Sequence, residues 1–493
     1  DFLRSNEHEM DFTYNQKSIT KKKLIPAILS VCRSPSSFIV VLLLFIFYLV
    51  VSFSSKASFP LDHAATSFND GTFCNSHGAE QFILYAPHSG FSNQLSEFKN
   101  GLLIAGILNR TLVIPPVLDH HAVALGSCPK FRVNEPSEIR RSFWNHSLDL
   151  LKAGRYVSMA DIIDVSSLVP SSVRVIDFRV FASMLCDVKA DVACSKATTA
   201  HSSIFERLKE CGSAATGNTG YAAKCVYPVD NDCKTTVWTY DSGENDGEKD
   251  SFQLIKKKKL SYIRLRRDIR MALGPGSPAE SYKILAFGSL FSSMYKGSQL
   301  HIDIGEAKRD TKINSLLKKL EFLPFSHEIL DAGKAVAKDM IEAPFLCAQL
   351  RLLDGQFKNH WEATFSGLKQ KLESLTAEVH PMHIFVMTDL EREKWAGTYL
   401  GDLARDYNQW KIHSLREDDD IVIKTAEKVA SLGKLIDVGL GDNVCSSRKL
   451  PDVLLYIEES VCSCASLGFV GTAGSTIADS VELMRKHKLC QIN

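Results

Sequence analysis

At 493 residues the chain is too long for one ordinary hydrophobic core, so we expect two domains with accessory segments. With 45% hydrophobic and 23% charged residues, the composition is that of a globular protein. The formal net charge of +1 argues against a protein that binds nucleic acid or another polyanion, because such proteins carry a basic excess.

An uncharged apolar run at residues 38–53 follows a polar segment that contains several lysines and an arginine. The run is slightly short for a membrane-spanning helix of about 20 residues, but residues 31–37 can extend it. Because the basic flank is N-terminal, we expect residues 1–37 to be a cytoplasmic tail and 38–53 a transmembrane signal anchor. A cleaved signal peptide is the alternative, although the segment before the run is long for one.

The cysteines indicate an oxidising compartment. Cys32 precedes the expected anchor and twelve of the thirteen cysteines follow it. Their spacing matches no zinc motif, since Cys462-Ser463-Cys464 is a lone C-x-C. An even number beyond an anchor favours several disulfides in a lumen, with reduced core cysteines as the alternative. Sequons at Asn109 and Asn145 are weak indications of the same secretory route.

After a stem at residues 54–80, we expect an N-terminal Rossmann-like domain at 81–325. It opens with a β-loop-α-β unit, and it lacks the G-x-G-x-x-G motif on which a dinucleotide site would depend. The cysteine-containing stretch from 186 to about 260 is interpreted as a disulfide-tied insertion. The predicted elements are strand 81–87, loop 88–94, helix 95–108, strand 111–116 and, beyond the insertion, strand 282–290.

A second domain is expected at residues 326–493, after a helical pattern that starts near residue 325. Strands alternate with helices there, which predicts an α/β fold with a parallel, doubly wound sheet. Two such domains would face a cleft at the carboxyl ends of their strands. The predicted strands are 345–350, 383–388, 410–414 and 467–471, and the predicted helices are 361–375, one from about 390, 421–432, 451–465 and 476–487.

Polar residues follow three of these strands. Arg351 and Asp354 follow the first, Asp389 follows the second, and the small residues Gly471 to Thr476 follow the third and open a helix. An arginine and a helix N-terminus on one rim would suit a nucleotide diphosphate. The structural alternatives are an ion pair between Arg351 and Asp354, and helix-capping roles for the other polar residues.

The phosphate site is expected to work without a metal. The chain has no G-x-x-x-x-G-K-[ST] motif and no D-x-D in a suitable loop, and the acidic run 418–420 leads a helix and is interpreted as compensation of the helix dipole. We therefore expect no metal ligands and no cofactor, with arginine in the role of the cation.

Three sequence blocks, in family order, resemble the GDP-fucose protein O-fucosyltransferases, especially their large plant branch. They are F-I-L-Y-A-P-H-S-G-F-S-N-Q (from residue 82), P-F-L-C-A-Q-L-R-L-L-D-G-Q-F (344–357) and F-V-G-T-A-G-S-T-I-A-D-S-V-E-L-M-R (469–485). The resemblance implies a GT-B-like fold and a type II anchor in the Golgi or endoplasmic reticulum. It also implies an inverting, metal-independent transfer of fucose from GDP-fucose to a hydroxyl of a protein or cell-wall glycan.

The same resemblance assigns roles to individual residues. Arg351 would hold the β-phosphate of the donor and assist its departure, and Asn93 would lie near the sugar and the diphosphate. Asp389, Ser475 and Thr476 would contact the nucleotide. The predicted catalytic residues are Arg351 and Asn93, and the predicted donor-binding residues are Gln349, Arg351, Asp354, Asp389, Gly471, Thr472, Ser475 and Thr476.

The chain also departs from the family pattern. Gln349 replaces the histidine of the H-L-R motif, Ser92 replaces a glycine, and Gly90 stands where some members have arginine. A glutamine can hydrogen-bond but cannot change its charge near neutral pH. Two alternatives stay open for this reason: use of another nucleotide sugar such as UDP-rhamnose, and a catalytically silent, membrane-anchored glycan-binding protein.

A general base for the acceptor hydroxyl is not fixed by the sequence. The candidates near the strand ends of the N-terminal domain are His88, Glu97, His120 and His121. Glu97 lies on a predicted helix and the histidines lie in loops, so each is more readily explained as a surface or structural residue.

Overall fold

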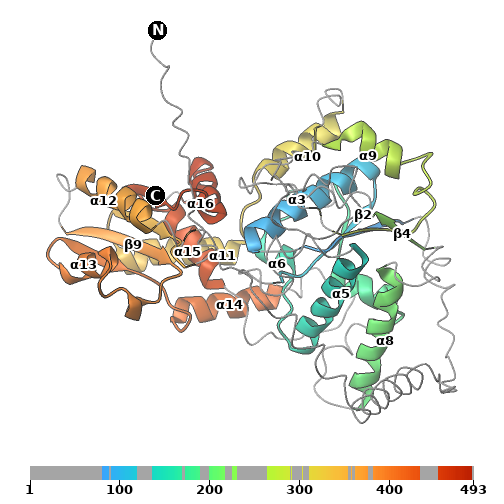
Figure 1. The fold of residues 1–493 in the computed structure, drawn as a ribbon, viewed down its shortest axis with the longest axis horizontal. Coiled ribbons are helices and arrows are strands. Elements are labelled where there is room, and N and C mark those ends of the chain that lie inside the picture. Colours follow the sequence, from blue (N-terminus) through green and yellow to red (C-terminus); the bar gives the residue numbers. More distant parts are fainter. Residues whose placement is uncertain are drawn as a thin grey trace, which may run out of the picture. The chain divides into compact units, whose positions relative to one another are not determined.

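The computed structural model describes residues 80–87, 90–118, 136–168, 172–188, 199–216, 225–229, 264–288, 290, 302–303, 310–353, 357, 361–375, 381–432 and 453–490 (Figure 1). The expected cytoplasmic tail, the anchor at 38–53 and nearly all of the stem lie outside these residues. Among the helices that are described, none is both long and apolar enough to span a membrane.

A five-stranded parallel sheet forms the N-terminal part, with strand order β3-β2-β1-β6-β4. Every residue of β1, β2 and β6 is buried, as expected for parallel strands that helices cover on both faces. This confirms the prediction of an α/β fold. The strands are β1 (Phe82–Leu84), β2 (Thr111–Ile114), β3 (Val175–Asp177), β4 (Val226–Val229) and β6 (Ile284–Phe287).

Helices cover the two faces of this sheet (Figure 1). One face packs against α3 (Phe91–Leu108), α9 (Arg266–Leu273) and α10 (Thr311–Glu321). The other packs against α5 (Pro136–Lys152), α7 (Phe178–Leu185) and α8 (Thr199–Ala215). The short helix α6 (Met159–Ile162) and the two-stranded pair β5 (Arg264–Leu265) and β7 (Ile302–Asp303) complete this part.

Helix α3 begins four residues earlier than the sequence predicts, so Asn93 lies in its first turn instead of in a loop. The sequence analysis placed Ser92, Asn93 and Gln94 in the loop 88–94. In the structure Phe91 is buried, and Gln94 is fully buried because its side-chain oxygen accepts the Leu118 N–H at 3.1 Å. The helix can therefore start at Phe91, with Gly90 as its N-cap.

The described part of the expected insertion at 186–260 is integral to the fold. Strand β4 lies within it and pairs with β6, and α8 packs on α5, where the Trp144 Nε1 donates to the Leu208 carbonyl at 2.9 Å. Strand β4 contains Pro228, which is tolerated because β4 lies at the edge of the sheet. Its short, proline-containing sequence explains why the strand was missed.

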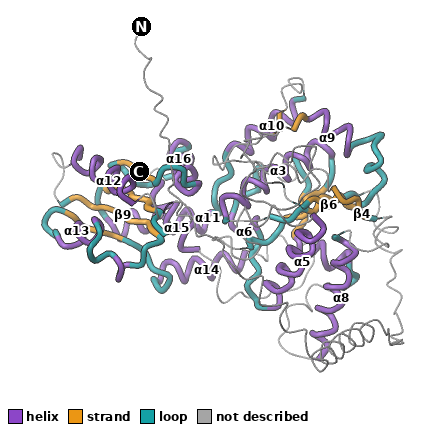
Figure 2. Tube along the Cα trace, viewed as in Figure 1, coloured by secondary structure: helices purple, strands orange, loops and turns teal. Residues whose placement is uncertain are grey.

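The C-terminal part has a four-stranded parallel sheet of order β10-β9-β8-β11. Figure 2 shows strands alternating with helices here too. Strand β8 and helix α12 have the predicted bounds. The strands are β8 (Phe345–Leu350), β9 (Met382–Thr388), β10 (Trp410–His413) and β11 (Gly468–Gly471), and the helices are α11 (His327–Ala335), which continues as a π-helix at Val336–Ile341, α12 (Trp361–Leu375), α13 (Tyr399–Arg405), α14 (Asp420–Leu432), α15 (Val453–Ser463) and α16 (Thr476–Lys486).

One predicted helix starts later than expected. The sequence predicted it from about Leu390, but α13 begins at Tyr399, and a 3-10 turn at Arg392–Lys394 comes between. Trp395 holds this connection in place, because its buried indole donates to the Leu390 carbonyl at 2.9 Å. Gly397 then reverses the chain with a φ of +80°, a conformation that favours glycine.

Three aromatic rings join the core on the α3 face of the first sheet to the core around α15. The Phe91 and Tyr456 ring centroids are 4.5 Å apart, and the Phe325 centroid is 5.4 Å from that of Tyr456. All three belong to one continuous hydrophobic cluster. The first turn of α3, which carries Asn93, is therefore anchored directly to the helix layer of the C-terminal sheet.

Disulfides are present, as the cysteine pattern predicted. Cys347 of β8 is bonded to Cys462 of α15, and Cys464, just after α15, is bonded to Cys490 beyond α16. A third bond joins Cys186 to Cys211. The lone C-x-C motif therefore ties the central strand and the C-terminal segment to the same helix.

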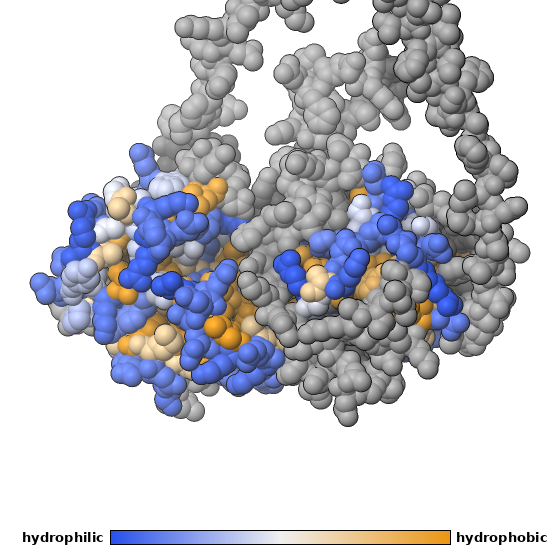
Figure 3. Space-filling model, turned by 90° about the horizontal axis from the view of Figure 1, so that it is seen from below, coloured by the Kyte–Doolittle hydropathy of each residue, from blue (hydrophilic) through white to orange (hydrophobic). Residues whose placement is uncertain are grey.

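The described surface is mainly hydrophilic on the face drawn in Figure 3, where hydrophobic residues form small separate patches. The large apolar side chains that are exposed come from unrelated elements: Met271, Met340, Leu353, Tyr407 and Ile423. Single exposed apolar residues of this kind are normal on a soluble domain.

Two histidines lie side by side on neighbouring strands. His383 of β9 and His413 of β10 stack with ring centroids 5.1 Å apart, and their facing nitrogens are separated by 3.2 Å. Burial, together with the neighbouring His383 and Lys411, lowers the pKa of His413 to about 4. The folded protein therefore resists a protonation that the unfolded chain accepts near pH 6.5.

We predict that this histidine pair makes stability sensitive to acid. Its contribution is complete above pH 6.5 and is lost as the pH falls towards 4, by about 1–2 kcal/mol after allowance for solvent screening. Urea unfolding measured between pH 7 and 4.5 should show a shallower pH dependence for His413→Gln than for the wild type. His327→Gln, which changes an exposed histidine, should keep the wild-type slope; an unchanged slope for His413→Gln would contradict the prediction.

Candidate functional site

The three strand ends that the sequence singled out lie next to each other. Strand β8 is flanked by β9 and β11, and all three run parallel, so their carboxyl ends meet at one rim. At this rim Gln349 pairs with Gly471 on one side and with Met387 on the other. Arg351 follows directly after β8. The predicted rim is therefore present.

Gln349 and Thr472 link β8 to β11 at this rim. The Thr472 N–H lies 3.0 Å from the Gln349 carbonyl and 3.2 Å from the Gln349 side-chain oxygen. The Thr472 hydroxyl donates to the same carbonyl at 3.1 Å and accepts the Arg351 N–H at 2.9 Å. Both side chains are almost completely buried. Gln349 therefore acts within the protein as a hydrogen-bonding cross-link.

Asp389 contacts the backbone after Arg351. Its two carboxylate oxygens accept the N–H groups of Leu352 and Leu353 at 2.7 and 3.0 Å. The alternative that Asp389 caps a following helix is wrong, because α13 starts ten residues later. The preceding residue, Thr388, accepts the Leu390 N–H at 3.2 Å through its hydroxyl oxygen.

The third strand end leads into the N-terminus of α16. Ser475 is the N-cap residue, yet its side chain makes no capping hydrogen bond. Its hydroxyl oxygen is buried and has no hydrogen-bond partner among the described residues. The first N–H groups of a helix have no partners within the helix, so this end can accept an anion. Thr476, the first residue of the helix, is half-buried.

Gly471 permits the close approach of α16 to β11. A Cβ at this position would lie 2.5 Å from the Ala478 Cβ and 2.9 Å from the Phe469 ring. Gly474 makes the turn before the helix with a φ of +77°. Gly471 therefore has a packing role. The sequence analysis had instead expected it to bind the donor.

Arg351 itself is half-buried, and its Cζ lies 5.6 Å from the centroid of the Phe357 ring. An aromatic face at this distance stabilises a guanidinium. Asp354, the expected donor-binding residue and alternative ion-pair partner, lies outside the described residues. The ion-pair alternative therefore stays a prediction.

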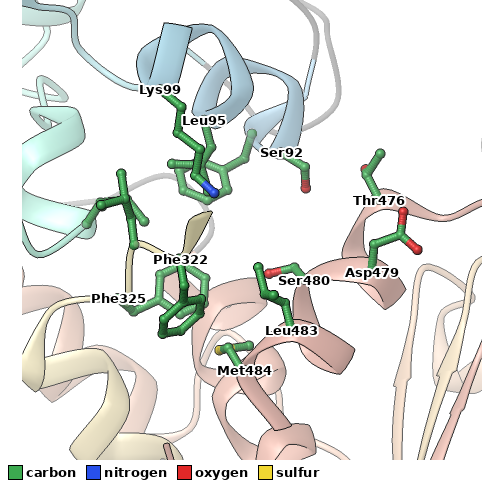
Figure 4. Close-up of a pocket in the computed structure, with 13 residues that line it drawn as sticks. Ser92, Leu95, Lys99, Phe322, Phe325, Thr476, Asp479, Ser480, Leu483 and Met484 are labelled. Atoms are coloured by element: carbon green, nitrogen blue, oxygen red, sulfur yellow. The ribbon is translucent and has the colours of Figure 1, made fainter. Parts of the chain in front are cut away.

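The first turns of α3 and α16 line the same pocket, of about 40 Å³ (Figure 4). Ser92 comes from α3, and Thr476 and Asp479 come from α16. Asn93 lies next to Ser92 in the sequence, but it is not one of the pocket residues. The structure thus brings the N-terminal and C-terminal sequence blocks together at this point.

Lys99 is a residue that the sequence analysis missed. Its side chain points towards this pocket and is 97% buried, since only 3% is exposed, and its Nζ donates to the Glu321 carbonyl at 3.3 Å (Figure 4). Burial lowers the pKa of Lys99 to about 8. The sequence feature that could have predicted the burial of Lys99 is its position four residues after Leu95, on the apolar side of the predicted helix.

The candidate bases receive little support. Glu97 was interpreted as a surface or structural residue; it is fully buried beside Tyr85, whose pKa is raised by burial and then by the Glu97 charge. Its burial agrees with the interpretation of Glu97 as a structural residue. His88, His120 and His121 lie outside the described residues.

Within the described part of the chain, no three His, Cys, Asp or Glu residues form a group that could hold a metal ion.

Comparison with known proteins identifies the family. A model of the GDP-fucose protein O-fucosyltransferase family matches residues 82–364. O-fucosyltransferase 30 of Arabidopsis thaliana is 54% identical over 475 residues, which cover 91% of this chain and 93% of that protein. The chain belongs to the GDP-fucose protein O-fucosyltransferase family. Its class is therefore that of the glycosyltransferases.

Solved structures of POFUT1 are more distant. The apo form is 14% identical with a TM-score of 0.39, and the complex with GDP-fucose is 15% identical with a TM-score of 0.38. The two alignments cover 83% of this chain and 96% and 95% of those chains. The family match includes Asn93 and Arg351 but ends before Asp389 and α16.

We predict that Gly471→Ala loosens the rim. The added methyl group has to push α16 away from β11, which should lower the free energy of unfolding by about 1–3 kcal/mol. Gly367→Ala is the matched control: it lies on the exposed side of α12 with no atom near the new methyl, and it should raise stability by about 0.5–1 kcal/mol. Urea denaturation measures both; equal stability of Gly471→Ala and wild type would contradict the packing role.

Proposed function

We propose that the protein transfers fucose from GDP-fucose to a hydroxyl of a protein or cell-wall glycan, with inversion and without a metal. The observation that carries this proposal is the rim itself. Arg351 and the N-terminus of α16 lie at adjacent ends of parallel strands, and the buried Ser475 hydroxyl has no hydrogen-bond partner among the described residues. Cationic and backbone N–H donors at such a rim suit a diphosphate.

The proposed chemistry depends on charge at the leaving group. Breaking the bond between the sugar and the phosphate leaves negative charge on the diphosphate. A donor group fixed beforehand near that position stabilises the transition state more than the bound substrate. Arg351 supplies a planar fork of donors and a permanent charge for this role. Asn93, in the first turn of α3, is proposed to orient the sugar from the N-terminal side.

GDP-fucose is proposed as the donor because the family match supports it and because the Gln349 substitution leaves the rim intact. Gln349 replaces a histidine, but its side chain is buried and bonded to the Thr472 N–H. The position therefore has a structural use that needs no charge. UDP-rhamnose as the donor, and a silent binding protein, are the outcomes that the experiment below has to separate.

Calorimetry with GDP, UDP and their sugars tests the donor. We expect GDP to bind and UDP not to, and we expect transfer from GDP-fucose to a glycan or protein acceptor pool. Arg351→Ala and Arg351→Lys should lower the transfer rate about 100- to 1,000-fold, because neither side chain reproduces the guanidinium fork.

Arg416→Ala is the control for these variants, since Arg416 is an exposed arginine in the segment between β10 and α14 and pairs with Asp418. It should transfer at the wild-type rate. Tight UDP binding without GDP binding would overturn the donor, nucleotide binding without turnover would favour the silent protein, and full activity in Arg351→Ala would remove the role of Arg351.

We also propose that residues 38–53 anchor the chain in the Golgi or endoplasmic reticulum membrane, with the catalytic part in the lumen. The uncharged run, its basic N-terminal flank and the disulfides support this arrangement. In intact microsomes, protease should remove only residues 1–37. Digestion of the catalytic part before the membrane is opened with detergent would exclude a lumenal position of that part.

A further inference from the structure

The chain leaves the sheet immediately after β8, and side chains from two neighbouring strands hold its backbone there. Arg351 is the second residue beyond Gln349, and residues 351–353 have no strand pairing. We infer that Thr472 and Asp389 are positioning residues that fix the direction in which Arg351 points. This inference rests on the proposed function, in which Arg351 meets the diphosphate.

Thr472 holds the segment from the β11 side. Its hydroxyl accepts the Arg351 N–H at 2.9 Å while donating to the Gln349 carbonyl at 3.1 Å. The hydroxyl thus takes the place of a main-chain group where the β11 pairing ends. Because one hydroxyl contacts the backbone on both sides of Leu350, it sets the conformation of the residue that leads into Arg351.

Asp389 holds the segment from the β9 side. One carboxylate oxygen accepts the Leu352 N–H at 2.7 Å and the other accepts the Leu353 N–H at 3.0 Å. Hydrogen bonds to an ionised acceptor are roughly twice as strong as neutral ones. Both carboxylate oxygens of Asp389 are thus bonded to the backbone of the segment that follows Arg351. This assigns Asp389 to the protein backbone, whereas the family resemblance had assigned it to the nucleotide.

The segment is also fixed from within. The Leu352 side chain is fully buried in the cluster beneath α12, and the Trp361 indole donates to the Leu352 carbonyl at 2.6 Å. The N–H groups of three successive residues, Arg351 to Leu353, are thus all bonded to side chains from β11 and β9 ends. The base of the Arg351 side chain has little freedom left.

Such restraint matters because arginine is long and flexible, and a displacement of about 1 Å at a reacting centre can cost about 100-fold in rate. Thr472 and Asp389 need not touch the donor to affect transfer. Their substitutions should act through Arg351, which separates a positioning role from direct donor contact.

The test is a double-mutant cycle on the transfer rate. Thr472→Val keeps the side-chain shape and removes the hydroxyl, and Asp389→Asn removes one of the two acceptor oxygens and the charge. Each should lower transfer from GDP-fucose about 10- to 100-fold in the wild-type background. In the Arg351→Lys background each should lower it less than about 3-fold, because the group they position is already lost.

Three further variants serve as controls. Thr472→Ser keeps the hydroxyl and should stay within about 3-fold of wild type. Thr425→Val removes a buried hydroxyl bonded to the Ile421 carbonyl in α14, and Asp419→Asn changes a carboxylate bonded to the Arg416 N–H; both should transfer at the wild-type rate. Thermal denaturation of every variant identifies losses that come from unfolding.

Equal fold-losses in the two backgrounds would overturn the inference, since Thr472 and Asp389 would then act on their own. Crystal structures of Thr472→Val and Asp389→Asn give a readout that does not depend on the donor. We expect the Arg351 guanidinium to move away from Phe357; an unmoved guanidinium would also overturn the inference. Failure of the proposed function is a different result: no transfer and no GDP binding by the wild type.

Discussion

The site depends on strand β8 being buried between two parallel neighbours. Every residue of β8 is buried, β9 and β11 lie on either side, and a disulfide at Cys347 bonds the strand to α15. Because all three strands run in the same direction, whatever follows them is delivered to the same rim. Arg351, Asp389 and the N-terminus of α16 meet for this reason, although they are far apart in the sequence.

The sequence predicted this half of the molecule well because its patterns are strong. A fully buried strand such as β8 is a short uninterrupted apolar run, and α12 shows a clear helical period, so both were found with the right bounds. Strand β4 was missed because four residues with a central proline carry no such pattern. Its place in the sheet comes from pairing with β6, which is a tertiary contact.

The site residues show the same limit at a finer scale. Residue type and position at a strand end were enough to select Arg351, Thr472, Asp389 and Ser475. They could not tell which partner each side chain would choose. Asp389 could equally cap a helix or bond a loop, and only the position of the Leu352 and Leu353 N–H groups decides between these two. Its expected contact with the nucleotide stays a prediction. For Gln349, likewise, only the hydrogen bond from the Thr472 N–H shows that the glutamine in place of histidine links two strands.

The order of strands in the C-terminal sheet has a consequence for biosynthesis. Strand β11 is the last strand of the described chain, yet it pairs with β8, and the hydrogen bond between Arg351 and Thr472 spans 121 residues. The disulfide between Cys347 and Cys462 spans a similar interval of 115 residues. During synthesis the arginine therefore emerges long before the strand that fixes it. A nascent chain acquires this rim only after β11 and the first turn of α16 have been translated, and a product terminated before β11 has the arginine without its support.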